Sequence, residues 1–182
     1  MRANALTIIH KFIRRELFDV SARLAGAGPE DIGAVRTAIA EVIELLHAHA
    51  AHEESGIEPQ VREHSAAHAE RLLHDHHRLH AELDAIGAAA QVLDAAPHDA
   101  CVATLLQLHL DWNRFVGGYL LHLDDEERTW FAHLGDFLPP VAFMAEAARM
   151  QGEEQGKAFL EKLWKVVTPD ERAIIEQARG GS

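Results

Sequence analysis

Residues 35–54 read VRTAIAEVIELLHAHAAHEE. Apolar residues recur through this stretch at the spacing of one face of an α-helix, and the same face continues into His49 and Glu53. A residue four positions further along a helix lies only ~40° around it, so these two side chains are one turn apart on the face expected to be buried. The stretch therefore predicts a core helix that ends in a pair of potential metal ligands.

Three other segments repeat this arrangement. His76 and His80 continue an apolar stripe with a spacing of four, and so do His122 and Glu126, while His10 lies on the stripe of the first segment. A buried glutamate costs free energy unless a cation or a hydrogen-bond donor compensates its charge. Together, these histidines and glutamates indicate a metal site in the core.

Glycine and proline residues divide the chain into helical segments. Four long helices are expected over residues 3–25, 30–55, 61–93 and 98–134, and shorter ones over residues 141–150, 154–167 and 169–178. The last begins with Thr168-Pro169-Asp170-Glu171, which combines an N-cap, a first-turn proline and a capping-box glutamate. Short connections predict an all-α fold, an up-down-up-down four-helix bundle over residues 1–135. Residues 136–182 are expected to form a helical extension packed on it.

The positions of the candidate ligands along their helices agree with this topology. In an alternating bundle, the ends of the helices that carry them lie together, and His10 and His49 lie at similar distances from the Gly28-Pro29 corner. The agreement is weaker for the other pair, because His122 is farther from Pro97 than His80 is. That hairpin requires either a long loop or a late start of the fourth helix.

The composition argues against several classes of protein. A net charge of −12 over 182 residues disfavours nucleic acids and anionic membranes as partners, because both attract basic surfaces. The chain has no run of about 18 apolar residues, the length that predicts a membrane-spanning helix. Cys101 is the single cysteine, and the N-terminus lacks the features of a secretion signal, so we expect a cytoplasmic protein.

The ligand types restrict the metal. Five imidazoles with two carboxylates suit iron, zinc or copper better than magnesium or calcium, and seven ligands are too many for one ion. If both glutamates bridge, one ion receives three histidines and the other two, and a bridging oxygen leaves one coordination position open. His64 and His68 are also four residues apart, but they face away from the apolar stripe and are expected to be solvated.

Four segments together resemble the hemerythrin HHE cation-binding family over about residues 5–135. They are HKFIRREL (10–17), HAAHEESGIEP (49–59), DHHRLH (75–80) and HLDDEERTWF (122–131). The resemblance implies a centre of two non-haem irons with a bridging oxo or hydroxo group. It implies that one iron is held by His76, His80 and His122, the other by His10 and His49, and that Glu53 and Glu126 bridge them.

The second carboxylate has an alternative. Oxygen-carrying hemerythrins place it five residues after the last histidine, where this chain has Glu127, whereas many bacterial relatives place it four residues after, as Glu126 is placed. We prefer Glu126 because Glu127 lies ~140° from His122 around a helix.

The resemblance implies functions that share one site. We rank first a protein that carries, scavenges or stores O2 or iron, because five histidines in an apolar pocket fit reversible O2 binding. The alternatives are a di-iron enzyme of peroxidase or oxidase type, acting on peroxide, O2 or nitric oxide, and an iron or oxygen sensor. Tyr119 lies one turn before His122, and its hydroxyl is predicted to approach the open iron, although packing in the core is its other interpretation.

Overall fold

The computed structural model describes residues 5–93, 98–134 and 153–180. These residues form helices joined by turns, without a β-strand among them, so the predicted all-α class is confirmed. The chain divides into two compact units, one of residues 16–133 and one of residues 1–15 with 134–182.

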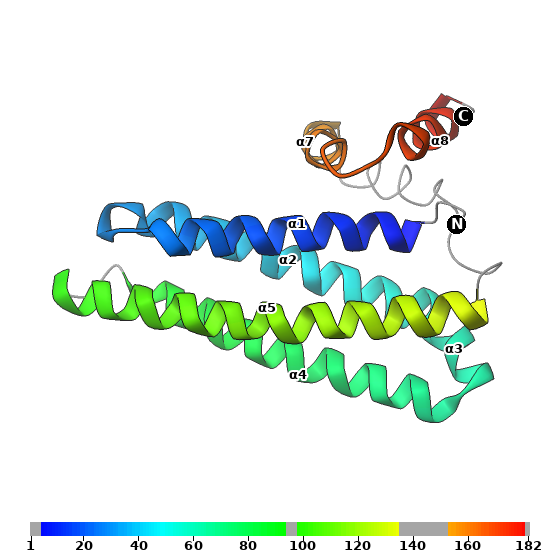
Figure 1. The fold of residues 1–182 in the computed structure, drawn as a ribbon, viewed down its shortest axis with the longest axis horizontal. Coiled ribbons are helices and arrows are strands. Elements are labelled where there is room, and N and C mark those ends of the chain that lie inside the picture. Colours follow the sequence, from blue (N-terminus) through cyan, green and yellow to red (C-terminus); the bar gives the residue numbers. More distant parts are fainter. Residues whose placement is uncertain (1–4, 94–97, 135–152, 181–182) are drawn as a thin grey trace. The chain divides into compact units, whose positions relative to one another are not determined.

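A four-helix bundle forms the first unit. It consists of the second half of α1 (Ala5–Gly26) together with α2 (Ile32–Gly56), α4 (Ala66–Gln91) and α5 (His98–Leu134). Figure 1 shows these helices side by side, each running opposite to the one before it. The predicted up-down-up-down topology is therefore confirmed.

The first corner of the bundle follows its sequence closely. After α1 ends, the short 3-10 turn η1 (Pro29–Asp31) leads directly into α2. The backbone N–H of Gly28 donates to Asp31 Oδ2 at 3.0 Å, which closes the turn. Proline at the first position suits this geometry because its backbone nitrogen has no hydrogen to satisfy.

The second connection differs from the expectation. A single helix over residues 61–93 is wrong, because a short helix, α3 (Glu58–His64), ends before Ser65 and α4 begins after it. Ser65 has extended backbone angles, and its Oγ accepts a hydrogen bond from the backbone N–H of His68 at 3.3 Å. This N-cap competes with a continuous helix. A late start of the fourth helix is also wrong, because α5 begins at His98.

Large apolar side chains fill the core of the bundle. Leu46, Leu83, Trp112 and Phe115 are almost completely buried. The indole Nε1 of Trp112 donates to the backbone carbonyl of Leu17 at 3.2 Å, so the polar atom of this residue is satisfied inside the core. This packing makes α5 a rigid support for the residues that follow Phe115 along it.

The second unit contains residues from both ends of the chain. Two helices, α7 (Glu153–Leu163) and α8 (Pro169–Gly180), contact the first half of α1. The rings of Phe12 and Phe159 meet edge to face with centroids 5.3 Å apart, and Arg15 Nη1 donates to the carbonyl of Lys162 at 3.0 Å. α7 ends earlier than predicted, at Leu163, and the helix predicted over residues 141–150 lies outside the described residues.

Glu171 has two roles at the start of α8. Its Oε2 accepts from the backbone N–H of Thr168 at 2.8 Å while its own N–H donates to Thr168 Oγ1 at 3.3 Å, which completes the predicted capping box. Lys11 Nζ donates to both carboxylate oxygens, at 2.7 and 2.9 Å. Burial raises the pKa of Glu171, but these donors outweigh it and lower the pKa below its ordinary value.

Glu171→Ala is expected to lower the free energy of unfolding by about 1 kcal/mol near pH 7, because the variant loses both the cap and the ion pair. A carboxyl whose pKa is depressed in the folded state stabilises it above the unfolded-state pKa, and this contribution is lost as the pH falls through the folded-state pKa. The difference between variant and wild type, measured by urea unfolding, should therefore shrink on acidification. Glu176→Ala is the control, since Glu176 forms an exposed pair with Arg172.

Candidate metal centre

Three helices of the bundle bring five of the predicted ligands together. α2 provides His49 and Glu53, α4 provides His76, and α5 provides His122 and Glu126. Each is buried, with at most 6% of its surface exposed. The side chains face inward because each continues the apolar stripe of its helix.

Short distances link these side chains. Glu53 Oε1 lies 3.1 Å from His49 Nε2, and Glu53 Oε2 lies 3.4 Å from His76 Nε2. Glu126 Oε1 lies 3.0 Å from His122 Nε2 and 3.5 Å from His76 Nε2. The two oxygens of Glu53 therefore face different histidines.

These atoms form two overlapping groups that can hold cations. The ligand atoms of His49, Glu53 and Glu126 lie within 4.8 Å of one another, and those of Glu53, His76, His122 and Glu126 do so as well. Both carboxylates belong to both groups. The two groups therefore overlap at these carboxylates, and each could hold a metal cation.

The buried charges need compensation. Two carboxylates with side-chain exposures of 2% and 0% would be costly without a cation or a proton nearby. Burial lowers the pKa of the His76 imidazole, but hydrogen bonds and charge interactions with Glu126 and Glu53 outweigh it and raise this pKa to about 10. Without a metal, a proton on His76 therefore balances part of the negative charge, and a metal ion must displace it to bind Nε2.

His80 lies outside both groups. Its half-buried ring is parallel to that of His76, with centroids 6.2 Å apart, and is 4.5 Å from the ring of His47. Burial, followed by His47 and His76, lowers the pKa of His80. Its role as a ligand stays a prediction.

The remaining predicted residues are placed as follows. His10 lies in the first half of α1 and is buried, and its part in the ligand set stays a prediction. Glu127 is half-buried and belongs to neither ligand group. His64 is exposed, with Nδ1 2.9 Å from the carbonyl of Gln60, and His68 Nδ1 lies 2.8 Å from Arg71 Nη2.

Replacing both His64 and His68 with glutamine should leave the metal content unchanged, because neither belongs to a ligand group. His76→Gln should lower the metal content sharply, because it removes a nitrogen that faces both shared carboxylates. Metal analysis after loading and desalting measures both results. Equal losses in the two variants would show that the ligand register of α4 is misassigned.

Tyr119 lies next to the ligand groups. It is buried, and its ring centroid lies 5.6 Å from that of His122. Burial, followed by the charges of Glu53 and Glu126, raises the pKa of Tyr119 well above its ordinary value, so the phenol keeps its proton.

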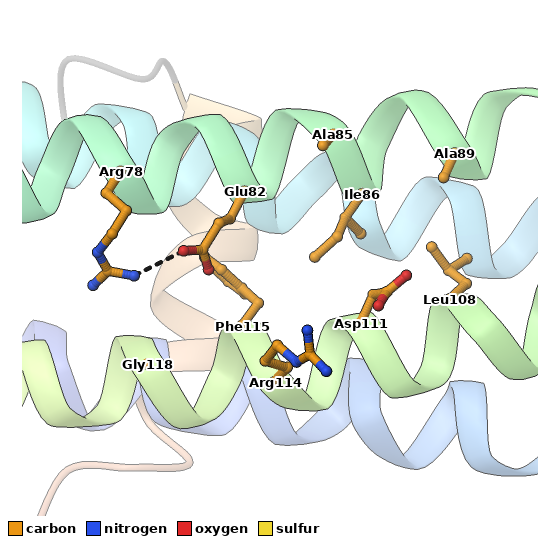
Figure 2. Close-up of a pocket in the computed structure, with 10 residues that line it drawn as sticks. All are labelled: Arg78, Glu82, Ala85, Ile86, Ala89, Leu108, Asp111, Arg114, Phe115 and Gly118. Atoms are coloured by element: carbon orange, nitrogen blue, oxygen red, sulfur yellow. Dashed lines mark hydrogen bonds and ion pairs between the residues drawn. The ribbon is translucent and has the colours of Figure 1, made fainter.

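A groove of about 540 Å³ runs between α4 and α5. In Figure 2, apolar side chains from both helices line it, together with the ion pair of Arg78 and Glu82 on α4 and with Asp111 and Arg114 on α5. Phe115 lines the groove, and its ring centroid lies 5.6 Å from that of Tyr119. Contacting rings therefore connect the wall of the groove to His122.

Sequence reasoning missed two neighbours of the centre. Glu54 Oε1 lies 3.2 Å from His76 Nδ1, on the opposite side of the ring from the shared carboxylates. His47 of α2 lies beside His80 of α4, with Nε2 3.3 Å from Asp84 Oδ1. The sequence feature that could have indicated Glu54 is its place directly after Glu53. No sequence feature indicated that His47 lies beside His80.

The helical bundle and its buried histidines and glutamates define a protein with a candidate centre for metal cations. Comparison with known families gives the same result, because the hemerythrin HHE cation binding domain matches residues 2–134. The chain therefore belongs to the hemerythrin HHE cation-binding family. Comparisons with curated proteins and with solved structures found no match. Within residues 5–93, 98–134 and 153–180, none of the helices has the length and apolar character needed to cross a bilayer.

Proposed function

We propose that this protein binds two iron ions in the bundle and uses them to bind O2, or a related small molecule such as peroxide or nitric oxide, reversibly. The arrangement of Glu53 supports the proposal most directly. Its two oxygens face His49 and His76 separately, which would let one carboxylate offer an oxygen to each of two ions. Glu126 is the proposed second shared ligand because it belongs to both ligand groups.

The proposed ligand set follows the family pattern. His76, His80 and His122 serve one ion, His10 and His49 serve the other, and Glu53 and Glu126 serve both. His80 is included because it follows His76 by one helical turn, and His10 because it is a buried histidine on α1. Imidazole-rich sites favour iron, zinc or copper, and family membership favours iron among them.

A two-iron centre supplies reversible electron transfer to a small ligand when it is bound. The protein's part is to hold the ligands, exclude water and withhold protons. Leu79 and Phe115 are almost fully buried apolar side chains, and each lies within two helical turns of a proposed ligand on its own helix. These features favour a carrier, scavenger or store, in which the bound molecule leaves unchanged.

Metal analysis of iron-loaded protein, together with its optical spectrum, tests the proposal. We expect about two irons per chain, as carboxylate-bridged centres in helical bundles contain. A saturating content of one iron, or a preference for zinc when iron is abundant, would exclude the two-iron function.

Tyr119→Phe tests the choice between carrier and enzyme. We expect reduced wild-type protein exposed to O2 to give a spectrum that is mostly reversed when the gas is removed and that slowly decays to the oxidised form. The variant should decay more slowly, because it lacks the phenolic hydrogen as a proton source. Stopped-flow absorbance measures the decay. Immediate irreversible oxidation of both proteins with sustained peroxide consumption would instead favour a peroxidase-type enzyme.

A further inference from the structure

Carboxylates approach both ring nitrogens of His76. Nε2 faces inward, 3.4 Å from Glu53 Oε2 and 3.5 Å from Glu126 Oε1, while Nδ1 faces outward, 3.2 Å from Glu54 Oε1. A neutral imidazole offers one lone pair and one N–H, and the partner of the N–H determines which nitrogen is free for a metal. An N–H on Nδ1 that donates to Glu54 leaves the Nε2 lone pair directed at the shared carboxylates.

The position of Glu54 suits an acceptor that keeps its charge. It follows Glu53 directly on α2, so it is turned by about 100° around the helix, away from the ligand groups and toward α4. Its side chain is 38% exposed, whereas that of Glu53 is 2% exposed. Water can therefore solvate the Glu54 carboxylate, and its ionised form does not carry the desolvation cost of the buried pair.

We propose that Glu54 is a positioning residue of the metal centre, which fixes the ring and tautomer of His76 and increases the electron donation of Nε2 through its negative charge. The inference rests on the proposed iron-binding function. Carboxylates that accept from the outer nitrogen of a ligating histidine act in this way in metal sites generally. A negative charge close to the centre also stabilises the more oxidised ions, so it lowers their reduction potential.

Two substitutions separate the hydrogen bond from the charge. Glu54→Gln keeps an acceptor oxygen at the same position and removes the charge, whereas Glu54→Ala removes both. Glu44→Ala is the matched control, because Glu44 is an exposed glutamate on the same helix and its loss changes the net charge equally. Circular dichroism of each metal-free protein checks folding, and the nearly isosteric glutamine variant carries the test if the alanine variant does not fold.

The experiment measures Fe2+ affinity by competition with a chelator and the midpoint potential of the iron-loaded protein by redox titration. We expect Glu54→Ala to weaken Fe2+ binding by about 10- to 100-fold, the usual effect of removing such a partner. Glu54→Gln should retain most of the affinity, but its midpoint potential should shift upward, and Glu44→Ala should match the wild type in both measurements.

The outcomes separate this inference from the function on which it rests. If the wild type binds about two irons while Glu54→Ala matches Glu44→Ala in affinity and potential, the positioning role is wrong and the proposed function survives. If the midpoint potential shifts upward equally in Glu54→Gln and Glu44→Ala, the charge of Glu54 has no specific effect on the centre, and this part of the inference is wrong. A wild type that binds no iron refutes the proposed function and the inference together.

Discussion

Glu53→Ala is expected to lower the iron content from about two ions per chain to less than one. The wild-type carboxylate directs one oxygen toward His49 and the other toward His76, so its removal should take a ligand from both proposed cation positions at once. Loss of a terminal histidine would weaken one position directly, whereas loss of a shared carboxylate weakens both. Glu126→Ala should have a comparable effect, because Glu126 also belongs to both ligand groups.

Metal analysis of the loaded variants measures this effect, and Glu127→Ala is its control. Glu127 is half-buried and outside both ligand groups, so its variant should keep the wild-type iron content. Iron could also be lost because the variant unfolds, and circular dichroism distinguishes this explanation from the loss of a ligand. Metal-free Glu53→Ala has one fewer buried negative charge, so it should remain folded by circular dichroism. A larger iron loss in Glu127→Ala than in Glu126→Ala would reassign the second bridge to Glu127.

Removal of iron is expected to lower the melting temperature by roughly 8–16 °C. A ligand at about 1,000 times its dissociation constant stabilises the folded state by about 4 kcal/mol, and each kcal/mol corresponds to about 2–4 °C in a chain of this size. The effect follows from burial, because a bound metal cation compensates the charges of two carboxylates that are buried in the core. Differential scanning calorimetry of loaded and chelator-treated protein measures it. Equal melting temperatures would indicate that no ion occupies the core.

The metal-free protein should also lose stability as the pH rises. The pKa of His76 is raised from 6.5 to about 10 in the folded chain, so the protonated ring contributes stability that is fully present below pH 6.5 and is lost as the pH rises through about 10. The melting temperature of metal-free wild type should therefore fall between these values. His76→Gln has no proton to lose there, so it should show a smaller decrease. If the melting temperature of the metal-free wild type does not change with pH, a proton on His76 does not balance the charge of the buried carboxylates.

The sequence by itself determined the all-α class and most of the helices, and it predicted most of the side chains that meet inside the bundle. Helical periodicity predicted α5 over residues 98–134, and the Gly28-Pro29 corner marked the first turn of the bundle. Periodicity also identified His49 with Glu53, because a spacing of four on an apolar stripe requires both side chains to face the core. These features depend on local rules, in which each residue's direction follows from its neighbours along one helix.

Packing between helices decided the rest. Ser65 interrupts the expected third helix, because capping competes with continuation of the helix and residue type alone does not decide between them. Between α2 and α4, Glu54 contacts His76, and the ring of His47 lies against that of His80. The side of a ring that such a residue contacts depends on the rotation and separation of two helices. Periodicity along one helix contains neither quantity, so only the tertiary structure placed Glu54 against His76 and turned His80 toward His47.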